Sequence, residues 1–312
     1  MHPESDAWTT LSWNSSDSGN EPDALPLRLG RIGYINVLPV YYALEQGLIA
    51  HNMEMVYGTP ARLNELACRG ELDIASTSSI EYARNWRSYY LVPHLAIGSR
   101  GPVQSVLLLS RRPLDQLDGG TILVSAQTHT SATLLRILLR RHVGIHPRYE
   151  NGDISSRLGE GETPEAFLAI GDEALLLRDR PEYSYSLDLG QAWLEWTGLP
   201  FIFGVWVADA ASVRNRAASV RQACRRLYRS KEWGRTRTDF FADLAADRGM
   251  LDRLRLASYF RGLVYELGER ELRGLDRFFE LLCEEGEISE KPGIRFFPSP
   301  EEIRLDDGGD HA

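Results

Sequence analysis

Two hydroxyl-rich segments are the first candidates for chemistry in this 312-residue chain. Residues 77–79 read Thr-Ser-Ser and residues 128–131 read Thr-His-Thr-Ser, and each segment follows a strand pattern and precedes a helix pattern. A helix N-terminus presents unpaired N–H groups, and nearby hydroxyls add further donors. Capping alone would explain either segment, because Ser and Thr are favoured N-caps. If the two segments face each other across a cleft, they would bind a small molecule with two carboxylates.

Two further polar residues fall at the expected cleft. Asn36 follows the first predicted strand. Its side chain has one of three roles there: it contacts a ligand, it forms a turn, or it caps the next helix. Arg100 lies in segment 98–105, whose glycines let backbone approach a ligand closely. Its guanidinium pairs either with a substrate carboxylate or with a neighbouring acid of the protein.

Several common catalytic motifs are absent from the sequence. It has no GxGxxG dinucleotide fingerprint, no Walker loop, no GxSxG elbow and no HExxH metal motif. His142 and His146 have the spacing of a helical metal pair, but Gly144 and Pro147 interrupt the helix that would orient both. We therefore expect neither a metal centre nor a dinucleotide site.

The elements that would position these residues alternate between strand and helix patterns. Strands are predicted at 27–32, 53–57, 72–75, 103–109, 121–125, 167–170, 183–189 and 201–207, and helices at 40–46, 61–69, 80–85, 132–142 and 191–196. From residue 210 to 285 the periodicity is helical, with segments 236–248, 252–267 and 270–285. This order predicts an α/β protein with two lobes and the ligand between them.

The lobe boundaries follow from the two extended segments that cross between the units. We expect lobe 1 to comprise residues 27–102 and 205–298, and lobe 2 residues 103–204. Residues 1–26 are polar and acidic and are expected to form a disordered tail, and residues 299–312 a flexible tail.

Composition limits the class of partner. The chain has 35 Lys and Arg against 44 Asp and Glu, a net charge of −9, which argues against nucleic acid as the main ligand. Its longest apolar run, residues 201–208, is too short to span a membrane. Three scattered cysteines form no disulfide framework, and no export signal is seen, so we expect a cytoplasmic protein. The basic helix at 213–231 is expected to present a solvated face; its role is left open.

Several strings, taken in order, resemble one family. They are Arg-Ile-Gly-Tyr-Ile-Asn-Val-Leu-Pro-Val-Tyr-Tyr at 31–42, Pro-Ala-Arg-Leu-Asn at 60–64, Gly-Glu-Leu-Asp-Ile at 70–74, Ser-Ser-Ile-Glu-Tyr-Ala at 78–83, Ser-Arg-Gly-Pro-Val at 99–103, Thr-Ser-Ala-Thr at 130–133, Gly-Asp-Glu-Ala-Leu at 171–175, and Asp-Leu-Gly at 188–190 followed by Trp-Thr-Gly-Leu-Pro-Phe at 196–201. Together they resemble the chorismate dehydratases of the futalosine route to menaquinone, over residues 28–285.

The resemblance implies a type II periplasmic-binding-protein-like fold used as a cytoplasmic enzyme. It implies removal of water from chorismate to give 3-[(1-carboxyvinyl)oxy]benzoate, with no metal or organic cofactor. On the family pattern Asn36 and Ser105 would line the reacting ring. Ser78, Ser79, Thr130 and Ser131 would surround the two carboxylates.

Some alternatives stay open at this point. The base is the substrate's own side-chain carboxylate or, from the protein, Asp172 or His129. An enzyme like 1,4-dihydroxy-6-naphthoate synthase is the rival within the same architecture. A non-catalytic small-anion-binding protein is a rival of another class, which would need an export or anchor signal. The oligomeric state is open, with a homodimer as one option.

Overall fold

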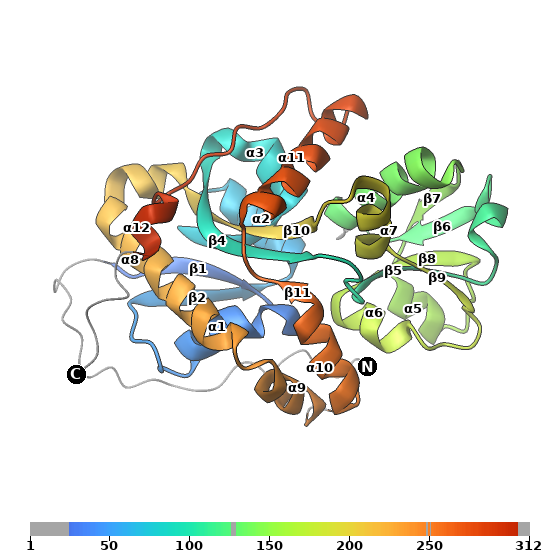
Figure 1. The fold of residues 1–312 in the computed structure, drawn as a ribbon, viewed down its shortest axis with the longest axis horizontal. Helices are drawn as coiled ribbons and strands as arrows, with labels where there is room; N and C mark the ends of the chain where they lie inside the picture. The colour runs from blue at the N-terminus through green and yellow to red at the C-terminus, as the bar shows by residue number, and fades with distance from the viewer. Residues whose placement is uncertain (1–24, 126–128, 248, 250, 305–312) are drawn as a thin grey trace.

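The computed structural model describes residues 25–125, 129–247, 249 and 251–304, and it divides them between two β-sheets (Figure 1). The first sheet has the order β11-β4-β10-β3-β1-β2. Its strands are β1 (Leu27–Ile32), β2 (Met53–Gly58), β3 (Ile74–Ser78), β4 (Tyr89–Ser99), β10 (Phe201–Asp209) and β11 (Leu263–Val264). The second sheet has the order β7-β6-β8-β5-β9. Its strands are β5 (Val106–Ser110), β6 (Thr121–Val124), β7 (Arg148–Asn151), β8 (Ala166–Ile170) and β9 (Tyr185–Asp188).

Helices cover both sheets, because parallel strands are joined by crossover helices that shield the apolar faces of the sheet. The helices grouped with the first sheet are α1 (Leu38–Glu45), α2 (Pro60–Cys68), α3 (Ser79–Asn85), α8 (Ala210–Arg235), α9 (Thr238–Ala246), α10 (Arg253–Gly262), α11 (Glu269–Glu284) and α12 (Pro300–Arg304). With the second go α4 (His129–Leu138), α5 (Ile154–Gly159), α6 (Gly171–Leu177) and α7 (Leu189–Thr197). We call these two groups the first and second lobes; they lie at the left and right of Figure 1.

Strand direction explains why the polar turns meet at one edge. β1 runs parallel to β2 and β3, so the carboxyl ends of β1 and β3 lie at the same edge of the first sheet. Asn36 follows one of these ends and Ser79 follows the other. In the second lobe, β8 ends at Ile170 and leads directly into α6. Ligands of open α/β sheets bind outside such carboxyl ends.

The helix starts follow the local chemistry of the sequence. Thr59 caps α2 by accepting a hydrogen bond from the Arg62 amide, and Pro60 occupies the first helical position. Asp188 caps α7 through the amides of Gly190 and Gln191. The two sheets, each with its own helices, form the two-lobe α/β architecture that the sequence predicts.

Three predicted features differ from the structure. The helix predicted at 252–267 ends at Gly262, because Leu263 and Val264 pair with β4 as β11. Residues 300–304, assigned to a flexible tail, form α12 with Ile303 buried. The basic helix is not solvated throughout, since Lys231 is 1% exposed and pairs with Glu266.

Most of the acidic tail predicted at 1–26 lies outside the described residues. Among the described helices, none has the length and apolar character needed to cross a membrane.

Candidate active site

A cavity of about 120 Å³ lies between the lobes at the carboxyl ends of the strands. Six of the nine predicted site residues line it: Asn36, Ser78, Ser105, His129, Thr130 and Ser131. Apolar walls come from both lobes and include Ile97, Val106, Ile170, Phe203 and Trp206. A mostly apolar pocket with a few convergent polar groups is the usual form of a small-molecule site.

The two hydroxyl-rich turns face each other and are joined directly. Ser78 caps α3, accepting a hydrogen bond from the Glu81 amide at 3.4 Å. The amide of Ile80, in the first turn of α3, donates to Thr130 Oγ1 of the second lobe at 3.1 Å, in a buried position. Ser79 does not line the cavity, because its hydroxyl donates to the Ile202 carbonyl of β10 at 2.6 Å. Thr128 lies outside the described residues.

Asn36 is held through its backbone and presents its side chain to the cavity. Its carbonyl oxygen accepts a hydrogen bond from the Tyr265 hydroxyl at 2.8 Å. Its Oδ1 atom is buried and has no hydrogen-bond partner among the described residues. Because a buried polar atom without a partner is costly, this oxygen is suited to accept a hydrogen bond from a ligand.

Ser105 follows a segment between the lobes that is held by hydrogen bonds to Asp188. Asp188 accepts hydrogen bonds from the amides of Val103 and Gln104, at 3.0 and 2.7 Å. Gln104 adopts the left-handed region with φ of 63°. The Ser105 hydroxyl accepts a hydrogen bond from the Tyr259 hydroxyl at 3.1 Å and donates to the Val103 carbonyl at 3.5 Å.

Asp172 lies beside the cavity without lining it. Its Oδ1 accepts a hydrogen bond from the Ile35 amide of the first lobe at 3.3 Å. Burial raises the pKa of this carboxyl to about 6, against the lowering effect of that hydrogen bond. Next to it, the Tyr34 ring lies 3.0–3.2 Å from the position that a Cβ on Gly171 would take, and Gly171 has φ of +58°. A larger residue at 171 would both be strained and meet this ring.

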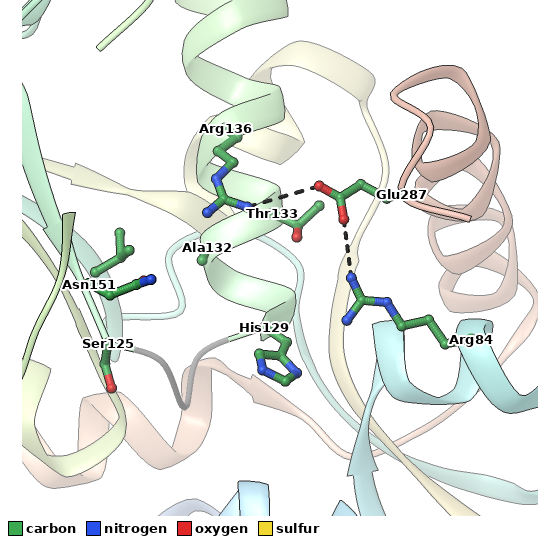
Figure 2. A pocket seen from close by; sticks show the side chains of 9 residues that line it. Arg84, Ser125, His129, Ala132, Thr133, Arg136, Asn151 and Glu287 are labelled. Carbon is green, nitrogen blue, oxygen red and sulfur yellow. Dashed lines mark hydrogen bonds and ion pairs between the residues drawn. The ribbon is translucent and has the colours of Figure 1, made fainter. Parts of the chain in front are cut away.

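His129 also lines a second hollow of about 290 Å³, which we call the outer hollow (Figure 2). Arg84 of α3, Arg136 of α4 and Glu287 also line this hollow, and Glu287 lies between the two arginines. Glu287 pairs with Arg84 at 3.1 Å and with Arg136 at 3.9 Å. Glu287 therefore links one arginine of each lobe.

Arg100 lies away from the cavity. Its Nε atom pairs with Glu271 of α11 at 2.9 Å; the Glu271 side chain is buried, and the Arg100 side chain is 56% exposed. The alternative in which Arg100 pairs with a neighbouring acid is therefore the one observed.

The sequence did not predict five polar residues that line or contact this site: Tyr34, Asn64, Ser76, Tyr259 and Tyr265. Thr77 also lines the cavity; it belongs to the hydroxyl-rich segment 77–79 but was not assigned to the carboxylates. The two C-terminal tyrosines carried no usable signal, because they contact the site only through the tertiary fold. Among the described residues, no group of three or more His, Cys, Asp or Glu side chains is arranged to hold a metal ion.

Two lobes with a cavity between them define a type II periplasmic-binding-protein-like fold, as predicted. Solved structures show the same fold. A crystal structure of a protein from Archaeoglobus fulgidus has a TM-score of 0.66 at 22% identity, covering 85% of this chain and 99% of that one. The periplasmic aliphatic sulphonate binding protein of Escherichia coli has a TM-score of 0.59 at 16% identity, covering 87% and 91%.

Sequence comparison identifies the family. The family model described as menaquinone biosynthesis matches residues 27–284. The chorismate dehydratase of Thermus thermophilus is 30% identical over 275 residues, which is 82% of this chain and 95% of that protein. The 1,4-dihydroxy-6-naphtoate synthase of the same organism is 30% identical over 186 residues, 58% of this chain and 65% of that protein. The chain belongs to the menaquinone biosynthesis family, and the resemblance noted from its motifs is confirmed.

Proposed function

We propose that this protein is a chorismate dehydratase, a lyase that removes water from chorismate and releases 3-[(1-carboxyvinyl)oxy]benzoate. The observation that carries the proposal is the cavity itself, which collects hydroxyls of both lobes around an amide oxygen with no partner among the described residues. The similarity to a chorismate dehydratase along 95% of that relative's length supports it. The rival synthase matches a smaller part of this chain.

The reaction needs little from the protein beyond orientation and hydrogen bonding. The C3–H bond of the ring breaks and its proton passes to a base. The electron pair forms the third ring double bond, and the C4–O bond breaks as hydroxide leaves. The hydroxide then takes the proton from the base and becomes water. Because the ring becomes aromatic, the product supplies much of the driving force. Ideal orientation contributes up to about 7–11 kcal/mol to such a step.

The polar groups of the cavity suit a dicarboxylate. The α3 and α4 N-termini, with Ser78, Thr130 and Ser131, would bind the carboxylates. A charge-assisted hydrogen bond contributes about 1.5–3 kcal/mol, so several such bonds offset the desolvation of the dianion. Asn36 and Ser105 would hold the ring and its departing hydroxyl. The side-chain carboxylate of the substrate is the base in this proposal. Asp172 does not line the cavity, and His129 lies where the cavity meets the outer hollow, because it lines both.

Entry of the substrate requires the lobes to separate. The cavity of about 120 Å³ is below the range of ligand pockets, roughly 300–1,000 Å³. Two hydrogen bonds between the lobes, Ile80 to Thr130 and Ile35 to Asp172, close it. We therefore propose that the described conformation is the closed one. A cytoplasmic location, where a biosynthetic intermediate is available, is part of the same proposal.

The experiment is incubation of the purified protein with chorismate, followed by ultraviolet absorbance and mass analysis. The proposal expects an aromatic product lighter than chorismate by one water. A protein that binds chorismate and returns it unchanged would indicate the non-catalytic binding function instead. Turnover only of the precursor of 1,4-dihydroxy-6-naphthoate would indicate the rival enzyme.

A further inference from the structure

A tyrosine of the C-terminal helix α10 contacts the candidate active site from outside the cavity. Tyr259 is 1% exposed, and its hydroxyl donates to Ser105 Oγ at 3.1 Å across 154 residues of sequence. Burial and the nearby negative charge of Asp172 raise the pKa of this phenol, so it stays protonated and acts as a donor.

The hydrogen bonds of Ser105 leave its own proton available. A serine hydroxyl has one proton to donate and two lone pairs to accept with. The Tyr259 hydroxyl fills one lone pair, so the Ser105 proton must point elsewhere. Its described acceptor is the Val103 carbonyl at 3.5 Å, a long contact that a better acceptor in the cavity would replace. The Ser105 carbonyl accepts a hydrogen bond from the Gly171 amide at 2.7 Å. This bond holds the backbone of Ser105 in place while its hydroxyl remains able to rotate.

We propose that Tyr259 is a positioning residue that orients the Ser105 hydroxyl to donate a hydrogen bond to the substrate. This inference rests on the proposed dehydration. The acceptor is the C4 oxygen, which gains negative charge as the C4–O bond breaks. A phenol that donates to Ser105 makes the serine a stronger donor in turn, because chained hydrogen bonds polarise one another. The contact therefore serves the transition state more than the bound substrate.

The test is a double-mutant cycle with chorismate as the substrate. Tyr259→Phe keeps the ring and removes the donor; it should lower kcat about 3- to 10-fold and leave KM within about twofold. In a Ser105→Ala background the same change should lower kcat less than about twofold further, because its target is gone. Tyr82→Phe is the matched control: Tyr82 is also a buried phenol, and it donates to the Gly293 carbonyl at 2.7 Å. It should leave kcat unchanged.

Equal losses from Tyr259→Phe in both backgrounds would overturn the proposal, since they would show a structural role. A second readout does not depend on turnover. The Tyr259 hydroxyl proton, followed by NMR in ligand-free protein, should shift when Ser105 is replaced by Ala. An unmoved resonance overturns the proposal, whereas a moved resonance in an enzyme that ignores chorismate supports the contact and contradicts the proposed function.

Discussion

We expect closure of the lobes to depend in part on the hydrogen bond from the Ile80 amide to Thr130 Oγ1, which one conservative substitution removes. Thr130→Val preserves the shape of the side chain and deletes the acceptor of the buried Ile80 amide. In the open form this amide is solvated, so the penalty falls on the closed form. A stranded buried donor costs about 1–3 kcal/mol, which favours the open form by about 5- to 160-fold.

Small-angle X-ray scattering of the ligand-free protein measures this shift directly. The variant should show a larger radius of gyration than the wild type, and its KM for chorismate should rise while it remains folded. Thr133→Val is the control, because Thr133 is buried on the same helix and has no hydrogen bond to the other lobe among the described residues. Identical scattering curves for wild type and Thr130→Val would show that the hydrogen bond between Ile80 and Thr130 does not hold the lobes together. The scattering arm needs no substrate, so it separates closure from any loss of carboxylate binding by Thr130.

Three further predictions concern individual residues. Asn36→Ala should lower kcat at least about tenfold, since it removes a group assigned to the transition state; turnover within about threefold of wild type would show that this assignment is wrong. The pKa of Asp172 is raised from 3.8 to about 6 in the folded protein. As the pH rises, the unfolded chain therefore loses this proton before the folded protein does, so the stability that the protonated carboxyl contributes to the fold is lost between about pH 4 and pH 6. Asp172→Asn should therefore be more stable relative to wild type at pH 7 than at pH 4, by about 1–3 kcal/mol in urea unfolding, and a pH-independent difference would contradict the pKa. Arg100→Gln leaves the buried Glu271 carboxylate without its ion-pair partner, so the free energy of unfolding should fall by about 1–3 kcal/mol. The value of kcat/KM should stay within about twofold of wild type; a large rise in KM would show that Arg100 binds the substrate.

Much of the fold could be predicted because local signals agree with the tertiary structure. The Thr59-Pro60 start of α2 and the strands on either side of it are read directly from capping residues and periodicity. β4 was missed because Pro93 and His94 interrupt its apolar run, and proline normally argues against a central strand. In the structure the ladder to β10 jumps between Ala96 and Leu91, so Pro93 lies at an irregularity where no ladder bond is lost.

The candidate site was predictable only where its residues follow strands. Asn36, Ser78 and Thr130 were found because each lies where a strand pattern gives way to a helix pattern. Tyr259 and Tyr265 were not found, since α10 and β11 reach the cleft through contacts across 154 and 229 residues. Arg100 was undecided for the same reason: its partner, Glu271, is 171 residues away.

We expect this cavity to bind chorismate with its ring at Asn36 and Ser105. The most direct measurement is a crystal structure of the slow Asn36→Ala variant soaked with chorismate. The ring should lie against residues 36 and 105, and the two carboxylates should lie at the N-termini of α3 and α4. Chorismate bound in the outer hollow instead, or absent from a cavity that stays closed at saturating concentration, would contradict it.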